Sequence, residues 1–134
     1  MGRRQDLERR QALLARFGRR IAGETRLESL LTIIAEEVRD LLGADRCSVF
    51  LLDAKTQELW TKVAHGVGGK VIRIPITKGI AGYVARSGTA VNIRDVKRDR
   101  RFTGDVDMST GYQTKSMLCV PLKNREGQSF GVFQ

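Results

Sequence analysis

The apolar pattern of the chain changes at Gly43. Before this residue, apolar side chains such as Leu31, Ile34 and Val38 recur at three- and four-residue intervals, the spacing of one helix face. After Asp45 they form short runs of strand length, separated by turn residues. Helices first and strands afterwards predict an α+β domain, with one antiparallel sheet and helices on one of its faces.

The helical part divides into two predicted helices. Within residues 1–22, Leu7, Leu14 and Ile21 recur every seven residues with Phe17 between them, which predicts a narrow stripe of coiled-coil type on an Arg-rich helix. We expect this N-terminal helix to pair in parallel with a second copy, and so to form a homodimer.

The second predicted helix has a broad apolar face. It should begin at a capping box, Thr25–Glu28, in which side chains bond to free backbone amides, and it should end at Gly43. A face of this width indicates packing against a large apolar surface. Residues 23–134 are therefore expected to form one domain, separate from residues 1–22.

Six later segments have the composition and length of strands. The first two flank a turn-length gap and predict an antiparallel hairpin, and a short helix is expected at residues 79–88. The chain stops within the last segment, so we expect the domain to be truncated there. The strands are predicted at residues 46–53, 58–65, 70–76, 90–93, 116–123 and 129–134.

Composition narrows the classes of protein. The longest apolar runs are far shorter than the roughly 18 residues that a membrane span needs, and residues 1–10 have no apolar signal region. We therefore expect a cytoplasmic protein without membrane insertion. Cys47 and Cys119 each lie in an apolar run, which predicts two buried, reduced thiols.

The net charge of +9 is concentrated in two segments. Residues 1–20 hold seven arginines against two acidic residues, and residues 94–101 hold five basic residues against two acidic ones. Nucleic-acid-binding domains usually combine such patches with aromatic residues or a recognition motif, and aromatics are only 6% here. We expect solvated basic surfaces rather than a nucleic-acid partner, with a non-specific polyanion contact as the alternative.

The sequence offers little material for catalysis. His65 is its one histidine, so neither a histidine metal site nor a nucleophile with its base is predicted. The glycines of residues 65–70 lack the spacing of a phosphate loop and precede a strand instead of a helix. We expect no catalytic residue, no metal and no cofactor.

Two segments indicate a binding site instead. The segment "GIAG" opens the short helix, where the amides of Ile80 and Ala81 are free donors and the helix dipole favours an anion. In "VDMSTGYQT", the side chains of Asp107, Thr110 and Thr114 form a polar row just before a strand. Together they predict a pocket for a small ligand with an anionic group.

Residues 24–134 resemble a GAF domain of the type found in cyclic-nucleotide phosphodiesterases and cyanobacterial adenylyl cyclases. The resemblance lies in "LLGADRCSVFLLD", "GIAGYVARSG" and "VDMSTGYQTKSMLCVPL", which occur in the family's order. It implies a six-stranded antiparallel sheet backed by helices, and a closing C-terminal helix that this chain lacks. It also implies a role in signalling without catalysis, with residues 1–22 as an N-terminal signalling helix, dimerisation through flanking helices, and control of an effector domain outside this chain.

The resemblance also implies a ligand site, with a cyclic nucleotide as the leading ligand. Amides of the helix that opens with "IAG" would hold the cyclic phosphate, and side chains from the strands and loops would contact ribose, phosphate or base. The residues at these positions are Ser48, Ile80, Ala81, Phe102, Thr103, Asp107, Thr110, Thr114 and Gln134.

Some positions depart from the family pattern. Thr103 stands where a tyrosine caps the pocket in some relatives, and Ala64 and His65 replace an aromatic and an acidic residue that read the purine. The phosphate end of the site therefore matches better than the base end. Two alternatives stay open: a ligand-free GAF module for dimerisation and signal transmission, and an enzyme that reduces free methionine sulfoxide through clustered cysteines. Finding Cys47 and Cys119 sealed in the sheet would count against the enzyme.

Overall fold

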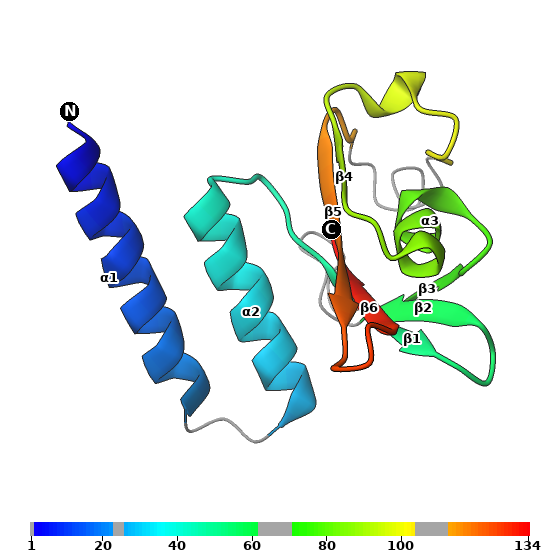
Figure 1. Cartoon of the computed structure of the whole chain (residues 1–134), viewed down its shortest axis with the longest axis horizontal. Helices are drawn as coiled ribbons and strands as arrows, with labels where there is room; N and C mark the ends of the chain where they lie inside the picture. The colour runs from blue at the N-terminus through cyan, green and yellow to red at the C-terminus, as the bar shows by residue number, and fades with distance from the viewer. Residues whose placement is uncertain (1, 23–25, 62–70, 104–112) are drawn as a thin grey trace. The chain divides into compact units, whose positions relative to one another are not determined.

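The structure is a computed structural model of the 134-residue chain, and it describes residues 2–22, 26–61, 71–103 and 113–134. The chain forms two compact units, Met1–Cys47 and Ser48–Gln134. The first contains two helices, and the second contains the sheet and a shorter helix (Figure 1). Within the described residues, none of the helices is both long enough and apolar enough to cross a membrane.

In the first unit, helix α1 (Arg3–Ala22) lies beside helix α2 (Leu27–Leu42) (Figure 1). Helix α2 ends as predicted at Gly43, whose φ of 64° is readily accessible to glycine. Its beginning differs from the prediction. The N-cap residue is Arg26, which makes no side-chain capping bond, and Thr25 lies outside the described residues.

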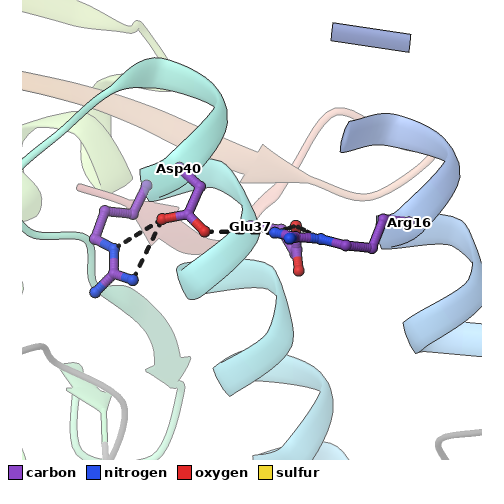
Figure 2. A network of polar contacts seen from close by, with 4 residues as sticks. Arg16, Glu37 and Asp40 are labelled. Atoms are coloured by element: carbon purple, nitrogen blue, oxygen red, sulfur yellow. Dashed lines mark hydrogen bonds and ion pairs between the residues drawn. The ribbon is translucent and has the colours of Figure 1, made fainter. Parts of the chain in front are cut away.

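A polar network links the two helices of this unit. Figure 2 shows the guanidinium of Arg16 on α1 reaching the carboxylates of Glu37 and Asp40 on α2. Arg16 donates from Nη2 to Glu37 Oε2 at 2.8 Å, and the Glu37 side chain is only 3% exposed. Because a buried carboxylate needs strong hydrogen bonds, this contact ties one face of α1 to α2.

The second unit contains the six-stranded antiparallel sheet that the sequence predicts. Neighbouring strands follow the order β3-β2-β1-β6-β5-β4, and the hairpin of β1 and β2 pairs Leu51 with Trp60. Residues 62–70, which include the predicted end of the second strand, lie outside the described residues. The strands are β1 (Val49–Asp53), β2 (Glu58–Thr61), β3 (Ile72–Pro75), β4 (Val91–Ile93), β5 (Met117–Lys123) and β6 (Ser129–Phe133).

Helix α3 (Gly79–Ser87) packs on β5 and β6 and ends, as predicted, at Gly88. Five of its nine residues are buried, including Val84, whose side chain is 0% exposed. Strands β1, β2, β4, β5 and β6 each contribute one fully packed residue to the same apolar core. These strand residues are Phe50, Leu59, Ile93, Cys119 and Val132.

A close backbone contact fixes the position of α3. A Cβ atom at Gly82 would lie 2.4 Å from the carbonyl oxygen of Ile76, so only glycine fits there. One turn later, the Nη1 of Arg86 donates to the same oxygen at 2.7 Å. The beginning of α3 is therefore held firmly against the segment that follows β3.

A 3₁₀ turn, η1 (Val96–Arg98), follows β4 within the basic segment 94–101. This segment is predicted to be a solvated basic surface, but Val96 within it is 0% exposed and belongs to the core. Asp95 caps the turn by accepting a bond from the amide of Lys97. The Val96 amide donates to the carbonyl oxygen of Lys115 at 2.9 Å, which fixes the turn beside the approach to β5.

Candidate functional site

The first turn of α3 has free backbone donors. Its N-cap residue, Lys78, makes no side-chain capping bond, and the turn contains no acidic residue. Among the described residues, neither Ile80 nor Ala81 donates a backbone hydrogen bond from its amide to the preceding segment. Their side chains are buried at 3% and 4% exposure, so the turn cannot easily rotate. Such a turn suits an anion because its amides and the helix dipole both favour negative charge.

The loop Asp99–Thr103 lies beside this turn. Gly79, the first residue of α3, has a φ of 73°, and a Cβ atom there would lie 4.0 Å from the carbonyl oxygen of Arg101. Phe102 is half-buried and packs against the core, whereas Thr103 is exposed. Phe102 therefore packs against the same apolar cluster that contains Ile80 and Ala81.

An ion pair organises this loop. The carboxylate of Asp99 accepts from Nε of Arg101 at 2.9 Å and from Nη2 at 2.6 Å. The same carboxylate accepts from the backbone amide of Arg101 at 2.9 Å. Hydrogen bonds from the Arg101 side chain, then from its amide, lower the pKa of Asp99 to about 2, and the pairing raises the pKa of Arg101.

The guanidinium of Arg101 also lies over the ring of Tyr83, 4.4 Å from its centroid. Tyr83 belongs to α3, so this contact joins the loop to the helix. The sequence did not predict the roles of Asp99 and Arg101, because there the two residues count only toward the net charge of segment 94–101. An acidic residue two positions before an arginine could have predicted the Asp99–Arg101 pair. The same spacing could not have predicted the contact of Arg101 with Tyr83.

Ser48 and Gln134 face each other on neighbouring strands. The amide of Ser48 donates to the carbonyl oxygen of Gln134 at 2.7 Å, and the amide of Gln134 donates to the carbonyl oxygen of Ser48 at 2.9 Å. Side chains alternate along a strand, so Ser48 shares a face with Phe50, and Gln134 with Val132. Both predicted site residues therefore lie on the sheet face that carries the core and α3.

The rest of the predicted site is described only in part. Thr114 is half-buried and precedes β5, next to the Lys115 carbonyl that holds η1. Asp107 and Thr110 lie outside the described residues, as do Ala64 and His65. The described residues thus supply the first turn of α3, the neighbouring loop and the paired strand ends.

The two cysteines are free and buried, as predicted. Burial raises the pKa of each thiol to about 12, which disfavours the reactive thiolate. Among the described residues, no group of three or more His, Cys, Asp or Glu side chains could hold a metal ion.

The chain belongs to the GAF domain family, whose model matches residues 26–134. Over 125 residues the chain is 38% identical to the dual 3′,5′-cyclic-AMP and -GMP phosphodiesterase 11A of Takifugu rubripes. That alignment covers 85% of this chain but only 14% of the relative. The chain is thus similar to a small part of a much longer protein.

Solved GAF structures share the fold. The GAF domain of a phosphoenolpyruvate-protein phosphotransferase from Coxiella burnetii aligns with a TM-score of 0.80 and 20% identity, covering 92% of this chain and 74% of that one. The free methionine-R-sulfoxide reductase of Neisseria meningitidis aligns with a TM-score of 0.75 and 22% identity, covering 92% and 70%. One fold therefore accommodates both types of protein, and the fold alone does not decide the function.

Proposed function

We propose that this chain is a regulatory domain that senses a small molecule, with a cyclic nucleotide as its leading ligand. The observation that carries the proposal is the first turn of α3, where Ile80 and Ala81 offer amides that Lys78 does not cap. Similarity to a cyclic-AMP and cyclic-GMP phosphodiesterase supports the choice of ligand. The cyclic phosphate carries one negative charge, which suits this turn.

The other proposed contacts follow the family resemblance. Asp107, Thr110 and Thr114 would contact ribose, phosphate or base, and Ser48 and Gln134 on the sheet would also line the site. Phe102 would lie close to the plane of the base, and Thr103 beside it would cap the site less completely than a tyrosine. Because Ala64 and His65 replace an aromatic and an acidic residue, discrimination between the two purines should be weak.

We further propose that the chain acts without catalysis and controls an effector domain elsewhere in a longer protein. The strongest argument against the reductase alternative is the state of Cys47 and Cys119. A thiol with a pKa of about 12 is almost fully protonated at neutral pH, and burial keeps both sulfur atoms from substrate.

Isothermal calorimetry with cyclic AMP and cyclic GMP tests the proposal. We expect one site per chain, and we expect Asp107→Ala to weaken binding roughly ten- to a hundredfold because ligand donors lose a charged acceptor. Asp45→Ala is the matched control, since it removes an exposed carboxylate from the other unit. A tight complex that Asp107→Ala leaves unchanged would refute the proposed role of that residue.

One observation favours a second candidate function, a module for dimerisation and signal transmission. Leu7 and Leu14 are 57% and 55% exposed on α1, although both are large apolar side chains. Arg16, which bonds to α2, lies about 180–200° around the helix from them. The face of α1 that carries these leucines therefore remains available to the same face of a second copy.

Light scattering tests this second candidate. We expect a dimer, and Leu7→Asp with Leu14→Asp should convert it to a monomer by placing charge on the proposed seam. Gln5→Asp with Ala12→Asp controls for the added negative charge, because these exposed positions of the same helix lie about 140–180° around it from the two leucines. An unchanged mass in the leucine variant would eliminate α1 as the dimer contact.

A further inference from the structure

Arg101 differs from the other basic residues of segment 94–101. Its side chain is 33% exposed, whereas Arg94, Lys97, Arg98 and Arg100 are all exposed residues. Asp99 holds the guanidinium through two parallel hydrogen bonds, and the ring of Tyr83 lies against its face. The Arg101 side chain is therefore held by two separate contacts. An arginine that served only as a solvent-exposed charge would need neither of them.

The backbone of the loop is fixed by the same pair. The Asp99 carboxylate accepts from the Arg101 amide, and the Asp99 carbonyl oxygen accepts from the Phe102 amide at 3.2 Å. Arg101 thus sits in a closed turn and contacts Tyr83 of α3 through its guanidinium, and its carbonyl oxygen lies on the side of Gly79 where a Cβ atom would be. The direction in which Phe102 and Thr103 leave this turn depends on these contacts.

We propose that Arg101 is a positioning residue, which clamps the loop carrying Phe102 and Thr103 to the helix carrying the Ile80 and Ala81 amides. The loop and the start of the helix are the two sides of the proposed ligand site, so the effect of the clamp on binding rests on the proposed function. The clamp sets their spacing before a ligand arrives. It therefore reduces the conformational entropy that the loop would otherwise lose on binding.

A simpler role for Arg101 would be long-range attraction of an anionic ligand. Arg98 separates the two explanations because it lies three residues earlier, carries the same charge and is 89% exposed. Arg98 pairs only loosely with Asp95, at 3.5 Å. If charge alone mattered, removing either arginine would weaken binding similarly, whereas a clamp depends on Arg101 alone.

The experiment measures binding of cyclic AMP and cyclic GMP to Arg101→Met, Arg101→Lys and Arg98→Met by calorimetry. We expect Arg101→Met to weaken binding roughly tenfold, and Arg98→Met to change it by less than about twofold. Arg101→Lys should not restore affinity, since an ammonium lacks the planar fork that fits the Asp99 carboxylate. Restoration by lysine, or an equal loss in Arg98→Met, would overturn the proposal.

Amide hydrogen exchange of the free protein keeps the test independent of the ligand. In Arg101→Met, the Phe102 amide should exchange faster, whereas the Gly88 amide, which donates to Val84 at the far end of α3, should not change. Tyr83→Leu, which leaves the ion pair intact, should give a smaller effect in the same direction. If the wild-type chain binds neither nucleotide, the proposed function fails, while faster Phe102 exchange still supports the clamp. Unchanged Phe102 exchange in Arg101→Met refutes the clamp whatever the chain binds.

Discussion

Helices α1 and α3 are held in their units by different kinds of contact. Five of the nine residues of α3 are buried, and a backbone carbonyl lies against Gly82 with no room for a side chain. Of the α1 side chains that the structure describes, none is buried, and the identified link to α2 is the polar contact of Arg16. Close apolar packing fixes α3 in one position, whereas α1 keeps an apolar face free of its own unit.

This difference matches what the proposed functions require of the two helices. A helix that offers amides to a ligand must not shift, because a small displacement misaligns every donor at once. A helix that transmits a signal needs a surface for a partner and a contact that can rearrange. Changes at corresponding positions of α1 and α3 can therefore test the contrast.

The largest effect is expected from matched glycine substitutions. Gly82→Ala places a Cβ atom 2.4 Å from the Ile76 oxygen, so we expect a loss of about 2–4 kcal/mol in the free energy of unfolding. Gly18→Ala, within α1, meets nothing within 4 Å and should gain about 0.5–1 kcal/mol from helix propensity. Urea denaturation followed by circular dichroism measures both. Effects of the same sign would contradict the contrast.

A second effect should appear in alkali. Burial raises the pKa of the Cys119 and Cys47 thiols from 9.0 to about 12, so the folded chain retains protons that the unfolded chain has lost. The stabilisation is complete below pH 9 and decreases between pH 9 and 12, by about 1 kcal/mol per pH unit for each thiol. Unfolding as a function of pH should show a shallower slope in Cys119→Ala. An identical slope would mean that this thiol is accessible in the folded state.

The polar link of α1 should have a smaller effect. Arg16→Met removes the two hydrogen bonds that the guanidinium gives to buried Glu37, and Arg16 is itself 47% exposed. We expect a loss of about 1–2 kcal/mol in thermal unfolding followed by helix content. Arg4→Met is the control, because the Arg4–Glu8 pair is 92% and 62% exposed and should contribute nothing measurable. Equal effects would mean that Arg16 does not tie α1 to α2.

Local patterns predicted much of the fold. The helix at residues 79–88 follows from its apolar spacing and from Gly88, and the hairpin of β1 and β2 follows from two apolar runs with a short gap. Such features depend on neighbours in sequence, so one sequence is enough to find them. The observed N-cap of α2, Arg26, lies one residue after the predicted one, Thr25, because a sequence pattern places helix ends only to within one or two residues.

The candidate site was less predictable because it depends on contacts between distant segments. The amides of Ile80 and Ala81 were identified from a helix start, which is a local feature. The pairing of Asp99 with Arg101 and the contact with Tyr83 required knowledge of where the loop returns to α3. The cluster of basic residues predicted that Arg101 lies on a solvated surface, whereas in the structure Arg101 lies between the carboxylate of Asp99 and the ring of Tyr83.

The most direct test of the central claim follows the backbone amides of Ile80 and Ala81 by ¹H–¹⁵N NMR during titration with cyclic AMP and with cyclic GMP. If the first turn of α3 binds the cyclic phosphate, both amide resonances should shift progressively and saturate, because each amide gains a charged acceptor. The Gly127 amide, in the turn between β5 and β6, provides the internal reference and should not move. If Ile80 and Ala81 keep their free-state shifts in the presence of millimolar nucleotide, α3 is not a phosphate site and the proposed function is wrong.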